Sequence, residues 1–280
     1  CGIELFGLGL FKKLVLADRA AYHADLVFKD PTDAGPATIF FAVLLYTVQI
    51  WADFSGYTDM GRGAARTCGI ILPENFKAPY LATSPSDFWR RWHITLSSWI
   101  RDYIYIPLGG NRVGLIRNVL IVLFSMSICG FWHGAALTFI LWGFYHGLLV
   151  ASQHVVKKVY PKFKLPRPIA CILMFLVVAL GWVLFRANSL EDAGVIYQGL
   201  SQLTIDGLLY ELVNNSRQVF ETVFILVVAL VIQFLEERAV VVEYYRSHLP
   251  SLIRGFSIGS VVCISIAARG TSAPFLYFQF

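Results

Sequence analysis

Three short polar segments stand out from an otherwise apolar sequence, and two of them contain a histidine. The first contains Asp53, the second is Trp-Arg-Arg-Trp-His ending at His93, and the third is Phe-Trp-His-Gly, which contains His133. An imidazole with its ordinary pKa near 6.5 is suited to take a proton from a hydroxyl group. The sequence around these histidines contains no Ser or Cys in a nucleophile-elbow motif. The residues therefore favour direct transfer, in which an imidazole deprotonates a hydroxyl as it attacks a thioester, over an acyl-enzyme.

His133 lies within residues 118–152, which contain no Asp, Glu, Lys or Arg. As one helix this stretch would span about 50 Å, whereas the hydrocarbon core of a bilayer is about 30 Å thick. Gly130 and Gly134 flank the histidine, so we expect a helix break or a short re-entrant turn there. At this depth a histidine either packs as a neutral core residue or acts as a general base in a membrane-buried tunnel. Depth together with the motifs described below favours the general base.

The segment before His93 interleaves aromatic residues with arginines: Trp89, Arg90, Arg91 and Trp92. This mixture suits a helix lying at the lipid headgroup boundary. It equally suits a helix that dips inward and lines a cavity, and the periodicity leaves both alternatives open. In the second case the arginine pair would hold an anionic donor, such as a phosphate-bearing thioester.

Asp53 follows the uncharged run from Ala37 to Ala52, so we expect it at or just inside one membrane face. Its depth fits helix-end solvation as well as a functional role. A metal site is not predicted, because His93 and His133 lack a third candidate ligand at metal-binding spacing. The five cysteines are scattered in or beside apolar stretches and are expected to be packing residues.

The elements that must position these residues are membrane helices. Hydrophobic residues make up 57% of the chain and charged residues 15%, and the mean hydropathy is +0.63, a balance typical of polytopic membrane proteins. We expect an all-α, polytopic transmembrane helical bundle with broken or re-entrant helices around a central tunnel. The net charge of +5 lies mainly in loops, so it indicates topology and no nucleic-acid partner is expected.

The apolar runs set the expected topology. Crossings are expected at residues 37–52 with a continuation past Asp53, at 118–152 with its break, at 168–185 and at 219–235. Residues 3–28 are expected to form a short membrane segment and an interfacial helix, residues 61–85 an ordered loop with short helical pieces, and residues 255–268 a last apolar run before an aromatic tail. The basic residues 157–167 are expected in the cytoplasm, which puts residues 188–216 outside.

Four motifs carry a resemblance to a known family. They are ADFSGYTDMGRGAARTCGIILPENFKAPYL, SPSDFWRRWHITLSSWIRDYIYIPLGGNR, GFWHGAALTFILWGFYHG and the terminal PFLYFQF. Together they cover much of the chain, and it resembles the membrane-bound O-acyltransferases, most closely the bacterial branch that contains the alginate O-acetylation membrane protein. The family carries further N-terminal membrane helices. The resemblance therefore implies that residues 1–280 are the C-terminal portion of a single membrane domain.

The resemblance implies that His133 is the catalytic histidine and that His93 is the second functional histidine. Substrate contacts are expected from Trp89, Arg90, Arg91, Trp92, Trp132 and Asp53. No cofactor is expected to be bound. An acyl thioester, either acetyl-CoA or an acyl carrier, would be the co-substrate.

The family also implies a reaction that spans the membrane. An acyl group, here acetyl, would pass from a cytoplasmic thioester through a tunnel to an acceptor outside. The expected partners are membrane lipids, an extracytoplasmic partner acetyltransferase and a polysaccharide acceptor, and the expected location is the bacterial cytoplasmic (inner) membrane.

Two alternatives remain. The first is D-alanyl transfer from a carrier protein to teichoic acid. The second is a non-enzymatic transporter, because broken helices and buried polar groups also build transporter sites. The absence of inverted repeats and the presence of the His/Arg/Trp segment disfavour the transporter.

Overall fold

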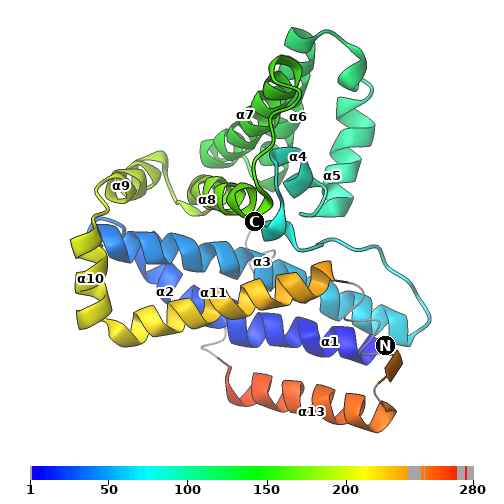
Figure 1. The fold of residues 1–280 in the computed structure, drawn as a ribbon, viewed down its shortest axis with the longest axis vertical. Coiled ribbons are helices and arrows are strands. Elements are labelled where there is room, and N and C mark those ends of the chain that lie inside the picture. Colours follow the sequence, from blue (N-terminus) through cyan, green and yellow to red (C-terminus); the bar gives the residue numbers. More distant parts are fainter. Residues whose placement is uncertain (1, 239–246, 249, 270–274, 276–280) are drawn as a thin grey trace. The chain divides into compact units, whose positions relative to one another are not determined.

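A computed structural model describes residues 2–238, 247, 248, 250–269 and 275, and every regular element among them is helical (Figure 1). In the part of the chain that the structure describes, five helices are long and apolar enough to cross a membrane: α3, α6, α7, α8 and α11. The predicted all-α, multi-pass membrane fold is therefore confirmed, while the central tunnel stays a prediction. The chain packs as two compact units, residues 1–74 with 194–280 and residues 75–193. That residues 1–280 form one membrane domain also stays a prediction.

The first unit is built around α3 (Pro36–Thr67), against which α1, α2 and α11 pack (Figure 1). Its other helical elements are α1 (Gly2–Phe11), the π-helical turn η1 (Lys12–Ala17), α2 (Asp18–Lys29), α10 (Ile205–Asn214), α11 (Ser216–Glu237) and α13 (Ser251–Ala267). The boundary between the units falls within α9 (Leu190–Ser201). The predicted loop at 61–85 begins later than expected, because α3 continues to Thr67.

Glycines allow α1 to lie directly on α3. A Cβ atom at Gly2 would approach the Gly63 carbonyl oxygen to 2.6 Å, and one at Gly9 would approach the Gly56 carbonyl oxygen to 2.5 Å. Any larger side chain would separate the helices, as in other close helix pairs of membrane proteins. This close contact brings Lys12, the first residue of η1, onto α3, where its Nζ donates to Asp59 Oδ2 at 2.7 Å.

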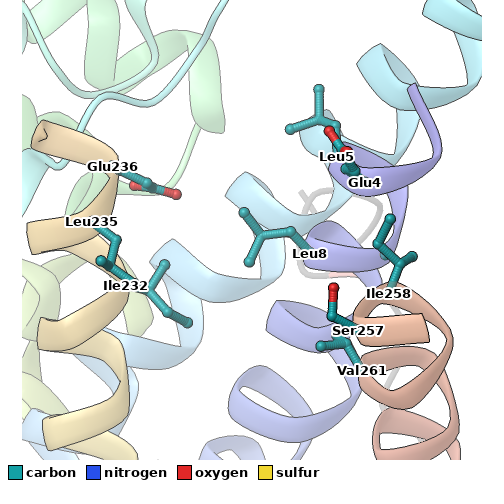
Figure 2. Close-up of a pocket in the computed structure, with 10 residues that line it drawn as sticks. Glu4, Leu5, Leu8, Ile232, Leu235, Glu236, Ser257, Ile258 and Val261 are labelled. Atoms are coloured by element: carbon teal, nitrogen blue, oxygen red, sulfur yellow. The ribbon is translucent and has the colours of Figure 1, made fainter. Parts of the chain in front are cut away.

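An apolar pocket of about 450 Å³ lies between α1, α11 and α13 (Figure 2). Aliphatic side chains such as Leu8, Ile232 and Val261 form most of its wall, and Glu4 and Glu236 are its acidic groups. Apart from Phe275, the predicted aromatic tail lies outside the described residues, and so does most of the loop after α11.

The second unit contains the two candidate histidines. Its elements are η2 (Pro79–Leu81), α4 (Pro85–Trp89), α5 (Ile94–Ile100), the π-helical turn η3 (Arg101–Tyr105), η4 (Gly110–Arg112), α6 (Leu115–His133), α7 (Leu137–Val159) and α8 (Arg167–Arg186). α6 and α7 form a hairpin, and α4 and α8 pack on α7 (Figure 1). Part of the basic segment predicted as a loop is helical, because α7 continues through Lys157 and Lys158 to Val159.

Candidate active site

His133 is the last residue of α6, and the chain reverses directly after it. Residues 134–136 separate α6 from α7, so the uncharged stretch breaks where the glycines predicted it to break. Packing requires both glycines. A Cβ atom at Gly130 would overlap the carbonyl oxygen of Phe139, and one at Gly134 would lie 2.7 Å from the Phe139 ring. His133 is therefore presented at the turn of a tightly packed helical hairpin.

Aromatic rings surround the His133 imidazole. The ring centroids of Trp132, Phe185 and Trp142 lie 4.9, 5.0 and 5.3 Å from it, and all three rings meet it edge to face. Within the described part of the chain, the imidazole makes no hydrogen bond to another residue. Its nitrogens are thus open to a substrate hydroxyl, as a general base requires.

His93 lies in the left-handed region immediately before α5, with φ 41° and ψ 57°. Such a backbone costs a non-glycine residue about 1–3 kcal/mol unless its surroundings hold it. Asn75 does so: its carbonyl accepts the Ile94 N–H at 3.0 Å, and its Oδ1 accepts the Thr95 hydroxyl at 2.7 Å. The His93 side chain is buried, and this burial lowers the pKa of His93 to about 4, so the imidazole is neutral at physiological pH.

Trp132 contacts both histidines. Its ring centroid lies 4.9 Å from that of His133 and 6.1 Å from that of His93. The sequence places Trp132 beside His133, whereas its contact with His93 depends on the fold of the second unit. The structure therefore brings the predicted base and the predicted assisting histidine to the same indole.

The two arginines before His93 have different environments. Arg91 donates from Nε to Asp87 Oδ1 at 3.1 Å, which ties it to α4. Arg90 approaches the same carboxylate only at 3.5 Å, and its side chain is 70% exposed. Arg90 is therefore the arginine of the pair that is free to reorient toward a ligand.

Trp92 is buried in an aromatic core. Its ring stacks on Phe88 at 5.6 Å and contacts Trp182 at 4.8 Å, and only 4% of the residue is exposed. In this arrangement Trp92 holds the segment against α8. Its predicted substrate contact stays a prediction.

Trp89 and Arg90 line a cavity of about 460 Å³, which we call the inner cavity. Cys129 lines it from α6, one helical turn before His133. Its wall combines apolar and hydroxyl side chains: Ile94, Ile100, Val122, Met126, Ser97, Ser98 and Ser125. The alternative in which the arginine-rich segment lines a cavity thus has a matching space next to α6.

A second cavity of about 650 Å³ shares Arg101, Tyr105 and His154 with the inner cavity. Lys157 and Lys158 add two positive charges, and the described residues that line it include no carboxylate. We call it the basic cavity. The two cavities together have a cationic end and a largely apolar end near α6, a combination that suits a thioester with phosphate groups on its carrier arm.

A third histidine of the cluster, His146 on α7, was not identified from the sequence. It is 1% exposed, stacks on Phe88 at 5.9 Å and contacts the rings of Trp142 at 5.1 Å and Trp89 at 5.2 Å. His146 therefore connects the wall of the inner cavity, through Trp89, with a ring that touches His133. The same signal that identified His133, an ionisable residue in an uncharged stretch, could have found it.

Asp53 lies in the first unit, in the middle of α3, and is 1% exposed. Its Oδ1 accepts from Lys13 Nζ at 2.7 Å, and Lys13 also pairs with Asp18 at 2.8 Å. Helix-end solvation of Asp53 is thus wrong, because the carboxylate is buried and ion-paired. Its predicted substrate role stays untested.

The described residues contain no group of three His, Cys, Asp or Glu side chains that could hold a metal ion. Apart from His93 and His133, the polar groups that line the two cavities are imidazole, indole, hydroxyl, amide and thiol groups and the cations of Arg and Lys. They can deprotonate a hydroxyl and bind an anion, which are the requirements of acyl transfer from a charged donor.

Comparison with known proteins points in the same direction. The sequence model of the membrane-bound O-acyltransferase family matches residues 1–191. A peptidoglycan O-acetyltransferase of Helicobacter pylori is 43% identical over 206 residues, 71% of this chain and 38% of the relative. A probable alginate O-acetylase AlgI of Pseudomonas fluorescens is 43% identical over 201 residues, 70% of this chain and 39% of the relative.

The chain is also similar, at lower identity, to a teichoic acid D-alanyltransferase of Bacillus subtilis. The two sequences are 32% identical over 158 residues, which are 51% of this chain and 40% of the relative. The chain thus spans about two fifths of the length of each of these three relatives.

Proposed function

Because the chain belongs to the membrane-bound O-acyltransferase family, we propose that it transfers an acyl group, here acetyl, from a thioester donor to a hydroxyl acceptor. The observation that carries this proposal is the placement of His133 and His93 around Trp132, with Cys129, one helical turn before His133, on the wall of the inner cavity. The acetyltransferase relatives from Helicobacter pylori and Pseudomonas fluorescens support acetyl as the group.

The proposed reaction uses His133 as the base. His133 takes the proton of the acceptor hydroxyl while the hydroxyl oxygen forms a bond to the thioester carbonyl carbon. The carbon–sulfur bond breaks, and the departing thiolate takes the proton from His133, which leaves an ester and a free thiol. His93, neutral because of its burial, orients the thioester carbonyl or the acceptor.

The donor would bind through the basic cavity. Lys157 and Lys158 would contact its phosphate groups, whereas Arg101 is already ion-paired with Asp102 at 2.7 Å. The acyl-bearing arm would lie in the inner cavity along Trp89 and Arg90. No bound cofactor is needed for this chemistry. The donor is a co-substrate, either acetyl-CoA or an acyl carrier.

The proposed direction is from the cytoplasm to the outside of a bacterial inner membrane, with lipids around the helices. The acetyl group would reach a polysaccharide, directly or through an extracytoplasmic partner acetyltransferase. A second candidate, D-alanyl transfer from a carrier protein, is favoured by the similarity to the Bacillus subtilis D-alanyltransferase.

Free-thiol release separates the two donors. The protein that carries this chain would be purified in lipid nanodiscs and supplied with acetyl-CoA or with a D-alanyl carrier protein. We expect thiol release and ester formation on a hydroxyl acceptor with acetyl-CoA. Release with the D-alanyl carrier alone would select the second candidate, and release with neither would contradict both.

Arg90→Ala is expected to raise KM for acetyl-CoA about tenfold or more, because a charge-assisted contact to the donor is lost. The same variant should use a short acetyl thioester without phosphates as well as the wild type does. Arg90→Lys should raise KM less than Arg90→Ala does, because lysine keeps the positive charge but lacks the planar guanidinium that can bind a phosphate through two hydrogen bonds. Lys162→Gln, which removes a charge outside both cavities, is the matched control. Unchanged acetyl-CoA kinetics in Arg90→Ala would remove Arg90 from the donor site.

The proposed orientation predicts opposite labelling of two loops. In a variant without native cysteines, single cysteines at positions 162 and 214 should react with an impermeant thiol reagent from opposite faces of sealed vesicles. The positive charges around Lys162 favour the cytoplasm for the first position. Labelling of both positions from one face would contradict a single crossing by α8.

A further inference from the structure

A polar cavity of about 730 Å³ lies in the first unit, between α2 and the start of α11. Arg19, Tyr22 and His23 line it from α2, where their spacing puts them on one helix face. The opposite wall is the α10–α11 turn and the first turns of α11, residues 214–218 and Glu221. Every side chain that lines this cavity is polar or aromatic. The pocket in Figure 2 differs, because aliphatic side chains form most of its wall.

Positive charge exceeds negative charge in this cavity. Glu221 is its only carboxylate among the described residues, and that carboxylate is shared by His23 Nε2 at 3.0 Å and Arg217 Nε at 3.6 Å. Arg19 donates from Nε to the Ala268 carbonyl at 2.9 Å, which fixes the direction of its guanidinium. The terminal nitrogens of Arg19 make no hydrogen bond within the described part of the chain. They remain available to an acceptor.

The first turn of α11 adds hydrogen-bond donors. α11 is 22 residues long, and its N-cap residue, Asn215, makes no side-chain capping bond. Asn215 Nδ2 is instead bonded to Glu211 Oε2. The backbone N–H groups of a first helical turn have no partner within their helix, and they favour negative charge. Here the first helical turn, residues 216–218, lines the same cavity as Arg19.

Neutral groups complete the cavity. Gln218 presents its amide and Asn214 its amide oxygen, since Asn214 Nδ2 already donates to the Tyr210 carbonyl at 2.8 Å. Such groups suit hydroxyls, and Tyr22 is 55% exposed and can pack against the face of a sugar ring. From this combination we propose that the cavity binds a polyhydroxylated ligand that carries carboxylates, namely a segment of an acidic glycan. Arg19 and Arg217 bind the carboxylates, and the amides bind the hydroxyls.

This inference rests on the proposed function in one respect: the proposed orientation puts the α10–α11 turn outside, where a polysaccharide acceptor would be. The chemistry of the cavity is independent of that orientation. The cavity would hold acceptor glycan at the membrane, separately from the residues that bind the donor.

Direct binding tests the proposal without any transfer reaction. The purified protein in nanodiscs is titrated with an oligouronate and with a neutral oligohexose of equal length. We expect the oligouronate to bind at least tenfold more tightly. Arg19→Gln and Arg217→Gln should each weaken oligouronate binding about tenfold or more, because each removes a charge-assisted contact. Arg217 is 93% exposed in its side chain, so its replacement should leave the fold intact.

Arg66→Gln is the matched control, because it removes the same charge from an exposed position in the last turn of α3. Equal affinity for acidic and neutral oligomers, or oligouronate binding that both arginine variants retain, would overturn the proposal. Thioester hydrolysis by the wild-type protein is measured in parallel. Its absence, with oligouronate binding intact, would contradict the proposed function and leave the glycan site standing.

Discussion

Replacing His133 by alanine or glutamine is expected to lower kcat by about 10²- to 10⁴-fold, the usual contribution of a positioned general base. The imidazole lies at the turn between α6 and α7, is enclosed by aromatic rings, and makes no hydrogen bond to another described residue. Glutamine fills similar space but cannot accept the proton, so it should not restore the rate. Steady-state transfer from acetyl-CoA to a hydroxyl acceptor measures the loss.

His93→Ala should lose less than His133→Ala or should mainly raise KM. Because burial lowers the pKa of His93 to about 4, His93 is largely deprotonated between pH 5 and 8 and its charge changes little in that range. His93→Gln should therefore keep the shape of the wild-type pH–rate profile in that range. His248→Ala, at a histidine outside both cavities, controls for loss of an imidazole. A folded His133→Ala protein that retains most of its activity would make His133 a packed core histidine.

Lys13→Met is expected to destabilise the protein by about 3–5 kcal/mol, the usual cost of breaking a buried ion pair by removing one partner. Lys13 is 6% exposed and pairs with Asp53 and Asp18, which are 1% and 2% exposed. The variant leaves two buried carboxylates without this cation. The thermal unfolding midpoint in detergent should fall accordingly.

Asp53→Asn added to Lys13→Met should recover part of that loss, because one uncompensated charge is removed. Lys29→Met, at an exposed lysine in the last turn of α2, should leave the midpoint nearly unchanged. Equal midpoints for Lys13→Met and wild type would show that the ion pair contributes little. In that case a loss of transfer activity in Asp53→Asn would support the substrate contact predicted from the sequence.

The membrane helices could be predicted from the sequence because their signal is local. The charge-free residues 118–152 are too long for one crossing, and Gly130 and Gly134 mark the break that the structure places between α6 and α7. The run after Pro36 continues past Asp53 as one helix to Thr67. The loop predicted from residue 61 was wrong at its start, because Gly63, like Gly56, is a contact point for α1 within this helix.

The side-chain pairings could not be predicted, because they join residues far apart in the sequence. Lys12 and Lys13 look like interfacial lysines, yet the close contact between α1 and α3 buries them against carboxylates more than 39 residues away. The sequence likewise leaves open whether the segment before His93 lies on the surface or lines a cavity. Only the packing of α4 and α5 beside α6 and α7 provides the inner cavity next to Trp89 and Arg90.

The most direct test of a histidine-dependent transfer across the membrane uses sealed proteoliposomes that contain the protein carrying this chain. Labelled acetyl-CoA is supplied on the face from which a cysteine at position 162 is labelled, and an impermeant hydroxyl acceptor is enclosed on the other face. We predict that labelled ester forms on the acceptor and that His133→Gln abolishes it. Ester that forms only when donor and acceptor share one face, or that forms equally with His133→Gln, would contradict the account.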